Sequence, residues 1–355
     1  MRLVRRVEVS RKKLLLIRLI SIILAFASIS LLLMVQEVSP IEFYAGLIFN
    51  VFGTEVGITE SVVRMIPMLL ISSGLSLSFR AGFWNIGAEG QLLAGAMAGY
   101  VLASNFGELP SYFLIPLLFI VGYLAGAAWG VIPALLKARL NVNDVLSTLM
   151  LYYILHWVFQ HMIHGPWKAV ESVGGLTYGG FAHTQVLPEN SQLPVIGGTR
   201  VHWPTLLIAL TSAFLVYFIL KRTTWGFEIR AVGDNPEASR AAGISYLEVL
   251  LFVASLSGGL AGIAGIGELC GIQKRFTPGF LSGYGFSAII TAWLSGSNPA
   301  NLILVNFLYG GLLVGGNYAM ISHKLPLGFI NMFNGTILLS VLACDFFARY
   351  ELRRD

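Results

Sequence analysis

One acidic residue lies in a polar patch between long apolar stretches, and this patch is the part of the chain best suited to chemistry. Residues 78–99 read SFRAGFWNIGAEGQLLAGAMAG, so that Glu89 stands close to Asn85 and Gln91. A carboxylate flanked by apolar sequence costs free energy unless it faces a cavity, a partner or the interface. Glu89 is therefore a candidate transport residue, or a structural acid that pairs with a backbone amide at a helix start.

The glycines of this stretch, four of them between positions 82 and 95, indicate how the polar residues are positioned. Glycine at such intervals lets backbones approach closely or lets a helix break. We expect a chain break followed by a new helix, with Asn85 as its N-cap and Glu89 in its first turn, near the positive end of the helix dipole. Breaks of this kind in transporters are tolerated where they line a cavity.

Aromatic residues flank this break and a second Gly-rich break at 279–296. Stacking on a flat ring is a sequence-tolerant way to hold a nucleobase or a sugar ring, and ordinary packing is the alternative role for each ring. We therefore assign a candidate substrate pathway with these seven members: Phe83, Trp84, Asn85, Glu89, Gln91, Phe286 and Trp293.

Composition limits the class of protein. The 355 residues are 56% hydrophobic and 12% charged, which predicts an all-α polytopic membrane protein. The net charge of +5 does not indicate a nucleic-acid partner, because the basic residues lie at span ends.

There is no P-loop sequence for ATP and no nucleophile–base or metal-ligand constellation, so neither an enzyme nor a metal site is predicted. His156, His161 and His164 have helical spacing, but an interfacial location is expected for them. Glycines at 258–267 predict close helix packing.

Apolar runs of suitable length predict roughly ten transmembrane helices, some short or interrupted, with both termini cytoplasmic. This orientation places 17 of the 23 Lys and Arg residues on the cytoplasmic side, where cationic loops are retained. The segment 36–60 is mixed in character and is expected on the outer face. The predicted spans are Leu14–Val35, Ser61–Phe79, Trp84–Asn105, Tyr112–Leu136, Val142–Ile163, Pro204–Leu220, Tyr246–Glu268, Phe286–Ser295, Asn301–Gly316 and Leu327–Phe347.

Two long polar segments separate the spans. Residues 164–203 are rich in Gly and Pro and predict an ordered external loop, with room for a short dipping helix. Residues 221–245 predict a cytoplasmic loop with a short helix. This helix has a capping residue before Pro236 and an acid, Glu237, in its first turn, and it ends at Gly243. A compact helix with Ala faces could dock in a groove on another subunit.

Three sequence motifs carry a resemblance to a known family. Residues 83–91, FWNIGAEGQ, look like the NIG-x-EGQ signature of ABC importer permeases that handle nucleosides, simple sugars and branched-chain amino acids. The segments 224–226, 230–236 and 241–244 resemble the coupling loop of the nucleoside and sugar members, which rests in a cleft of the ATPase subunit. Residues 143–150 resemble a third stretch of the family, with Asp144 in place of the usual Glu. A local salt bridge with Lys137 or Arg139 is expected for Asp144.

The resemblance implies one permease domain, residues 1–355, in a bacterial-type inner membrane. It implies ABC ATPase subunits, a second and non-identical permease, an extracytoplasmic substrate-binding protein and no cofactor. The expected function is to transport a nucleoside by alternating access, with a simple sugar as the second candidate solute. ATP is expected to be hydrolysed in a separate subunit. The residues implied in ATPase coupling are Gly233, Asp234, Asn235, Pro236, Ala238, Ala241 and Gly243.

A different class remains as the alternative, namely an ion- or proton-coupled secondary transporter of a small polar solute. Such a protein needs a coupling carboxylate deep in its helix bundle, and Glu89 is the candidate. That alternative leaves the cytoplasmic helix at 234–243 without a role.

Overall fold

Helices make up most of the regular structure in the described part of the computed structural model, as the composition predicts. It describes residues 2–5, 11–169, 171–173, 176–178, 181–296, 298–325 and 350–353, with the isolated positions 328, 332, 335, 336, 339 and 340. Within these residues, five helices are long and apolar enough to cross a membrane, or six if one bent pair counts as a span. The predicted all-α membrane fold is therefore confirmed.

The helices and strands follow one another closely along the chain. In order they are β1 (Arg2–Arg5), α1 (Arg11–Val35), α2 (Pro40–Phe52), α3 (Glu55–Arg80), α4 (Ala88–Phe106), α5 (Ser111–Leu140), α6 (Asp144–His164), β2 (Glu171–Val173), β3 (Leu176–Tyr178), the 3-10 helix η1 (Glu189–Ser191), α7 (Trp203–Arg222), α8 (Thr224–Asp234), α9 (Pro236–Ala241), α10 (Tyr246–Ile266), the π-helix η2 (Gly267–Gln273), α11 (Tyr284–Ser295), α12 (Pro299–Ser322) and β4 (Tyr350–Arg353).

The chain divides into two compact units, Met1–Ser61 with Gly310–Asp355, and Val62–Tyr309. In the first unit the chain bends by 117° between α1 and α2. The Tyr44 hydroxyl fixes this bend by donating to the Phe26 carbonyl at 2.7 Å. Strand β1 pairs antiparallel with β4. The expectation that residues 36–60 are mixed in character missed α2, because its 13 residues are too few for a membrane span and polar residues flank them on both sides.

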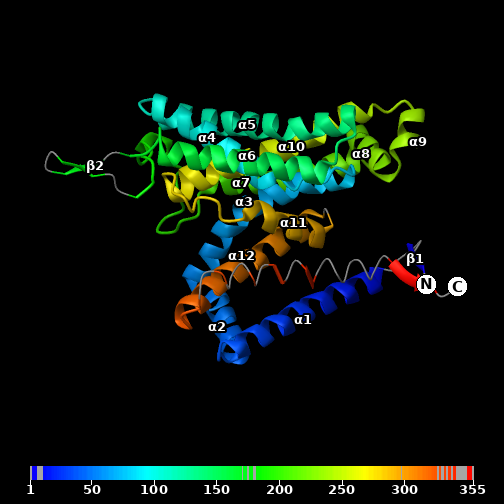
Figure 1. Cartoon of the computed structure of the whole chain (residues 1–355), viewed down its shortest axis with the longest axis horizontal. Coiled ribbons are helices and arrows are strands. Elements are labelled where there is room, and N and C mark those ends of the chain that lie inside the picture. The colour runs from blue at the N-terminus through cyan, green and yellow to red at the C-terminus, as the bar shows by residue number, and fades with distance from the viewer. Residues whose placement is uncertain are drawn as a thin grey trace. The chain divides into compact units, whose positions relative to one another are not determined.

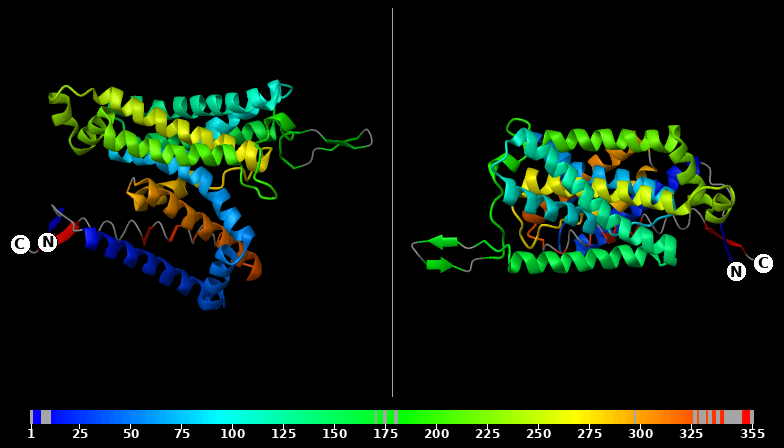
Figure 2. Two further views of the ribbon diagram at one scale, coloured as in Figure 1. Left: turned by 180° about the vertical axis from the view of Figure 1, so that it is seen from behind. Right: turned by 90° about the horizontal axis from the view of Figure 1, so that it is seen from above.

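The second unit contains a bundle of long helices. Figure 1 shows α4, α5, α6, α7 and α10 running beside one another, with α8 and α9 at one end. The β2–β3 hairpin lies at the opposite end in both views of Figure 2. We call these the α8–α9 end and the hairpin end of the bundle.

Close packing of α10 against α4 and α5 forms the centre of this unit. A β-carbon at Gly262 would stand 3.1 Å from the Cα of Gly126 and still closer to the Gly122 carbonyl. Only a residue without a side chain permits this approach. The glycines at 258–267 thus serve helix packing, as predicted from their apolar surroundings.

The predicted spans match most helices to within a few residues. Helix α11 has 12 residues, so it is about 18 Å long and shorter than a hydrocarbon core of about 30 Å. This agrees with the predicted short segment Phe286–Ser295. The span predicted at Leu327–Phe347 lies almost wholly outside the described residues. Helix α10 continues directly into η2, a conformation that is rare and frequently found at functional sites.

Candidate functional site

The α3–α4 linker, residues 81–87, is the irregular segment that the sequence predicts between two helices. Helix α4 begins at Ala88 with Gly87 as its N-cap, so the prediction that Asn85 caps this helix is wrong. The Asn85 side chain instead points into the protein and is fully buried. The physical reason lies in a pairing with Gln91, which satisfies the Asn85 amide more completely than a cap would.

The Asn85 and Gln91 side chains form a closed pair of hydrogen bonds. Asn85 Nδ2 donates to Gln91 Oε1 at 2.8 Å, and Gln91 Nε2 donates to Asn85 Oδ1 at 2.9 Å. Asn85 Nδ2 also lies 3.2 Å from the hydroxyl oxygen of Ser257 on α10. All three residues are at most 1% exposed. The pair thus ties the linker to α4 and α10 inside the bundle, where unpaired amides would cost free energy.

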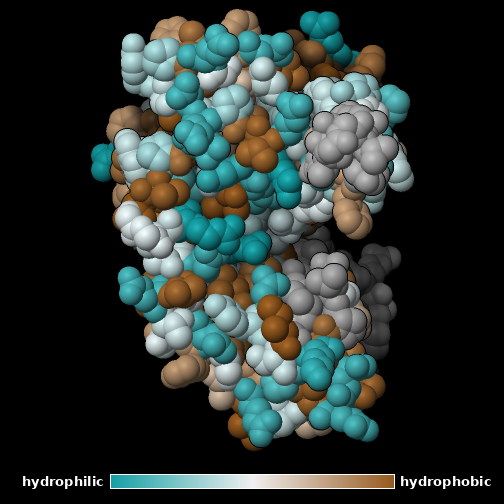
Figure 3. All heavy atoms as spheres, turned by 90° about the vertical axis from the view of Figure 1, so that its left-hand side faces the viewer, coloured by the Kyte–Doolittle hydropathy of each residue, from teal (hydrophilic) through white to brown (hydrophobic). Residues whose placement is uncertain are grey.

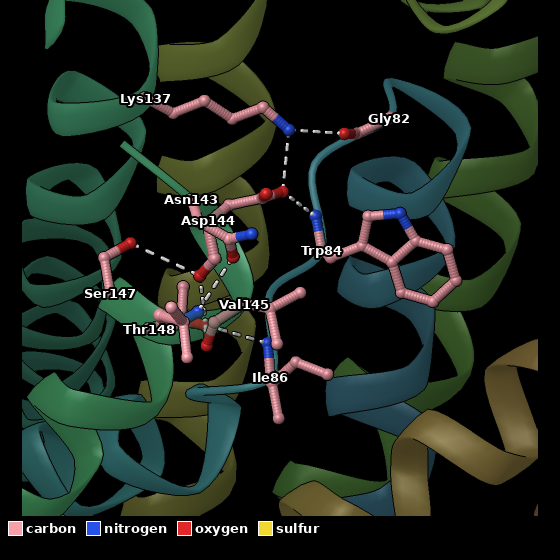
Figure 4. A network of polar contacts seen from close by, with 10 residues as sticks. Gly82, Trp84, Ile86, Lys137, Asn143, Asp144, Val145, Ser147 and Thr148 are labelled. Carbon is pink, nitrogen blue, oxygen red and sulfur yellow. Dashed lines mark hydrogen bonds and ion pairs between the residues drawn. The ribbon is translucent and has the colours of Figure 1, made fainter. Parts of the chain in front are cut away.

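A partly buried ion pair holds the same linker from the other side. Lys137 Nζ, near the end of α5, lies 2.7 Å from Asp144 Oδ2, at the start of α6. Lys137 also donates to the Gly82 carbonyl at 2.6 Å, and Asp144 accepts from the Trp84 amide at 2.5 Å (Figure 4). The local salt bridge expected for Asp144 is confirmed, and Lys137 is its partner. The pair therefore supplies hydrogen-bond partners to backbone groups that no helix satisfies.

Thr148 adds a third contact between α6 and the linker. Its hydroxyl oxygen lies 3.2 Å from the Ile86 amide nitrogen, and it donates to the Asp144 carbonyl at 2.7 Å (Figure 4). Asn143 caps α6 by accepting from the Leu146 amide at 3.1 Å. The start of α6 is thereby fixed where it can hold the linker.

Glu89 caps a different helix from the one that carries it. Its Oε1 accepts from the Gly283 amide at 2.9 Å, and its Oε2 accepts from the Gly285 amide. Helix α11 begins at Tyr284 with Gly283 as its N-cap, and glycine has no side chain with which to cap. The buried carboxylate of α4 supplies the missing acceptor at the positive end of α11. The structural reading of Glu89 thus has direct geometric support, with both oxygens directed at backbone amides.

A second buried carboxylate, Glu268 of η2, was missed from the sequence. Gln273 Nε2 donates to Glu268 Oε1 and to the Phe280 carbonyl, each at 3.0 Å. Nearby, Arg64 of α3 donates to the Tyr284 hydroxyl at 2.9 Å and interacts electrostatically with Glu268. An acid within an apolar run is itself a signal of function or burial, and this signal in GELCGIQ would have identified Glu268.

The four aromatic members of the predicted pathway set fall into three places. Trp84 and Trp293 contact each other, with ring centroids 5.2 Å apart, and Phe79 packs against both. Phe286 packs edge-on against Tyr152 at 5.4 Å. Phe83 is fully buried beneath the Lys137 ammonium. Trp84 is 37% exposed and Trp293 is half-buried, so this pair can meet a solute or a partner, as can the half-buried Phe286.

At the hairpin end, the segment 181–202 covers the chain between η2 and α11. The Thr184 amide donates to the Phe276 carbonyl, and the Phe276 amide donates to the Thr184 hydroxyl oxygen, both at 3.0 Å. Phe276 packs against the rings of Tyr100, Phe159 and Phe280. Figure 3, which faces this end, shows hydrophilic residues interspersed with apolar ones. The segment 181–202 includes the 3-10 turn η1. That residues 164–203 form an external loop with a dipping helix stays a prediction.

His202 closes this segment just before α7, and its imidazole is buried. Burial holds the pKa of His202 at about 4, and the positive charge of Arg200 acts in the same direction. The ring lies against the backbone of Gly271, where a β-carbon would stand 2.8 Å from the imidazole Cγ. The neutral form of His202 therefore packs on η2.

At the α8–α9 end, α9 forms where the sequence predicts it. Asn235 is the N-cap and accepts from the Glu237 and Ala238 amides, each at 3.0 Å. Gly243 follows the helix with a positive φ of 83°. The exposed coupling candidates, which a partner subunit can reach, are Asp234, Asn235, Pro236, Ala238, Ala241 and Gly243.

Gly233 differs from the other coupling candidates. A β-carbon there would stand 3.2 Å from the carbonyl carbon of Ala81 and closer still to the Arg80 carbonyl. Asp234 forms an ion pair with Arg80 at 3.1 Å. Gly233 therefore serves the close contact between the end of α8 and the start of the linker.

Comparisons with known proteins identify the family of this chain. Residues 57–342 match the family described as "Branched-chain amino acid transport system / permease component". The glucose ABC transporter permease protein TsgB13 of Haloferax volcanii is 33% identical over 94% of this chain and 88% of its own length. The guanosine ABC transporter permease protein NupP of Bacillus subtilis is 32% identical over 94% of each chain. A second guanosine permease of that organism, NupQ, is 25% identical over 71% of this chain and 79% of its own length.

The match to the family covers well over half of the chain, and it includes both the linker and the α8–α9 end. A permease component is the membrane subunit of its importer, and the ATPase is a separate chain. This chain therefore belongs to the family of permease components of ABC importers.

Proposed function

We propose that this permease subunit carries a nucleoside, with a simple sugar as the next candidate solute. The similarity to permeases named for guanosine and for glucose, each covering 94% of this chain, carries the proposal. The partly exposed Trp84–Trp293 pair supports it, because aromatic rings stack on a flat base with little dependence on its identity. The candidate pathway residues are Phe83, Trp84, Asn85, Glu89, Gln91, Phe286 and Trp293.

The membrane arrangement that goes with this function has about ten crossings and both termini in the cytoplasm. The whole chain, residues 1–355, acts as one permease domain of a bacterial-type inner membrane. The α8–α9 end faces the cytoplasm in this arrangement, and the hairpin end faces outward. The distribution of Lys and Arg supports the orientation, since 17 of 23 lie on the proposed cytoplasmic side.

Each end of the bundle is proposed to bind a different partner protein. A substrate-binding protein docks on the 164–203 segment, and an ABC ATPase receives the exposed helix α9. The second permease of the complex is non-identical. The occurrence of two different permeases, NupP and NupQ, both named for guanosine in Bacillus subtilis, supports this arrangement.

Uptake of labelled solutes tests the proposed function. Cells that carry this chain and its partner subunits are given guanosine, adenosine, uridine, ribose or glucose, with and without the ATPase. We expect nucleoside uptake that depends on the ATPase. Uptake of ribose or glucose alone would mean that the solute is a simple sugar and not a nucleoside. Uptake that persists without the ATPase and collapses with the proton gradient would favour the secondary transporter instead.

Substitutions in α9 test the docking of the ATPase. Ala238→Arg places a long charged side chain on the exposed helix without changing its Asn235 cap, so uptake is expected to fall while the subunit still assembles. Glu228→Gln on α8 is the matched control outside α9. Unchanged uptake in Ala238→Arg would refute docking at this helix. Gly233 is unsuitable for this test, because any side chain there displaces the Arg80 backbone.

A further inference from the structure

The linker 81–87 lies between two sets of contacts at the α8–α9 end. On one side, Gly233 packs on the backbone of Arg80 and Ala81, and Asp234 pairs with Arg80 at 3.1 Å. These contacts connect the start of the linker to the loop that carries α9. A displacement of that loop therefore acts first on the end of α3 and the beginning of the linker.

On the other side, Lys137 and Asp144 hold the middle of the linker through its backbone. Lys137 binds the Gly82 carbonyl, and Asp144 binds the Trp84 amide (Figure 4). The two side chains are 17% and 11% exposed, so water competes weakly for them. The ion pair thus joins residues 82–84 of the linker to the α5–α6 corner, which opposes local bending of the linker.

Beyond the linker, the chain leads directly to the interior of the bundle. Glu89 stands two residues after Gly87 and accepts from the amides of Gly283 and Gly285 at the start of α11. Trp84, within the linker, contacts Trp293 on α11. A movement of the linker consequently reaches α11 at two points, one at its start and one near its end.

We propose that Lys137 and Asp144 are positioning residues that make the linker transmit movement from the α8–α9 loop to α11. This rests on the proposed coupling role of the α8–α9 end. The ion pair keeps residues 82–84 in one conformation, so that a displacement of Arg80 and Gly233 moves Trp84 and Glu89 together. Without the pair, the linker yields locally and α11 stays in place.

The test compares transport with ATP hydrolysis in proteoliposomes that contain the complete importer. For Asp144→Asn, which keeps an oxygen near the Trp84 amide but removes the charge, solute uptake per ATP hydrolysed is expected to fall at least tenfold. Basal ATPase activity per assembled complex is expected to stay within twofold of native. Lys137→Gln should behave alike. Asp144→Glu, which restores the charge, should recover the ratio to within threefold.

Arg139→Gln is the matched control, because Arg139 is exposed and stands two residues after Lys137 on the same helix. It should leave the ratio unchanged. An unaltered ratio in Asp144→Asn and Lys137→Gln would overturn the proposal. Failure of both variants to assemble would also overturn it, since the pair would then serve folding rather than transmission.

A second readout separates this proposal from the identity of the solute. The docked binding protein is expected to stimulate the ATPase of the native complex, and this signal must cross the bundle whatever solute is carried. We expect the stimulation to be lost in Asp144→Asn and kept in Asp144→Glu. If native uptake of every tested solute fails while this pattern holds, the proposed solute is wrong and the transmission role stands. Equal stimulation in both variants would contradict the transmission role.

Discussion

Two interruptions break the long helices of the second unit, and different forces hold them. The linker 81–87 is short, and charged side chains of α5 and α6 bind its backbone. The segment 267–283 between α10 and α11 is longer, with the π-helix η2 continuing α10 as far as Gln273 before the irregular part. It pairs through backbone hydrogen bonds with residues 184–193, under a cluster of aromatic rings. A short break contains few groups that can hydrogen-bond with one another. Its backbone amides and carbonyls therefore depend on charged side chains of the neighbouring helices.

Glu89 connects the two interruptions. It stands on the first turn of α4, directly after the linker, and it caps α11 at the end of the second segment. The comparison therefore predicts that charge removal damages the linker most. The longer segment, with many weaker contacts, should lose less with any single change.

The largest effect is expected for Asp144→Ala. It leaves the partly buried Lys137 without a counter-charge and the Trp84 amide without an acceptor, so we expect a loss of about 3 kcal/mol of unfolding free energy. Denaturant titration of the purified subunit in detergent micelles measures it. Removing both charges in Lys137→Met with Asp144→Ala should cost less than the sum of the single changes. Additive losses would show that the pair does not interact.

A pH effect of about 2 kcal/mol is expected at the second interruption. Folding holds the pKa of His202 at about 4, against an ordinary histidine pKa of 6.5, so the unfolded chain binds a proton first as the pH falls. Stability should therefore decline from pH 6.5 toward pH 4, by about 2 kcal/mol at pH 5. The difference between native protein and His202→Phe, followed by thermal unfolding across this range, isolates the contribution. A constant difference would contradict the buried neutral imidazole.

Thr184→Val should cost about 1–2 kcal/mol, because it leaves the buried Phe276 amide without its acceptor. Thr184→Ser keeps the hydroxyl and serves as the matched control. The same denaturant titration compares the two variants. Serine lacks the methyl group and valine lacks the hydroxyl, so a loss in Thr184→Ser as large as in Thr184→Val would contradict a dominant role of this hydrogen bond.

The smallest effect is expected for Arg80→Ala. The side chains of Arg80 and Asp234 are 42% and 66% exposed, and exposed ion pairs contribute less than about 1 kcal/mol. Unfolding free energy should therefore change little, in contrast to Asp144→Ala. A loss as large as that of Asp144→Ala would mean that solvent exposure does not make the Arg80–Asp234 ion pair weaker than the Lys137–Asp144 pair.

Much of this fold is readable from the sequence, because apolar runs and caps are local signals. The short helix at Pro236 and the packing glycines of α10 follow from residue type and spacing alone. The partners of Glu89 do not, since Gly283 and Gly285 lie almost 200 positions away. The role of Asn85 was not readable for a different reason. Its bond to Gln91 is local, but it competes with a capping role that the sequence favours equally.

Helix α2 and Glu268 were missed for different physical reasons. Helix α2 has only 13 residues between polar flanks, so it lacks an apolar run of span length, although the helix packs one face against the remainder of its unit. The predicted span ended at Glu268, whereas the helical path continues through η2 to Gln273. This acid therefore lies inside the apolar run, where it signals function or burial, and not at its end.

Hydrogen exchange at the start of α11 tests most directly whether Glu89 joins the two interruptions. The amides of Gly283 and Gly285 are compared in the native protein and in Glu89→Gln, whose neutral side chain offers one acceptor oxygen in place of two. We predict faster exchange at residues 283–285 in the variant, with exchange in α5 and α10 unchanged. Equal protection in both proteins would contradict the account.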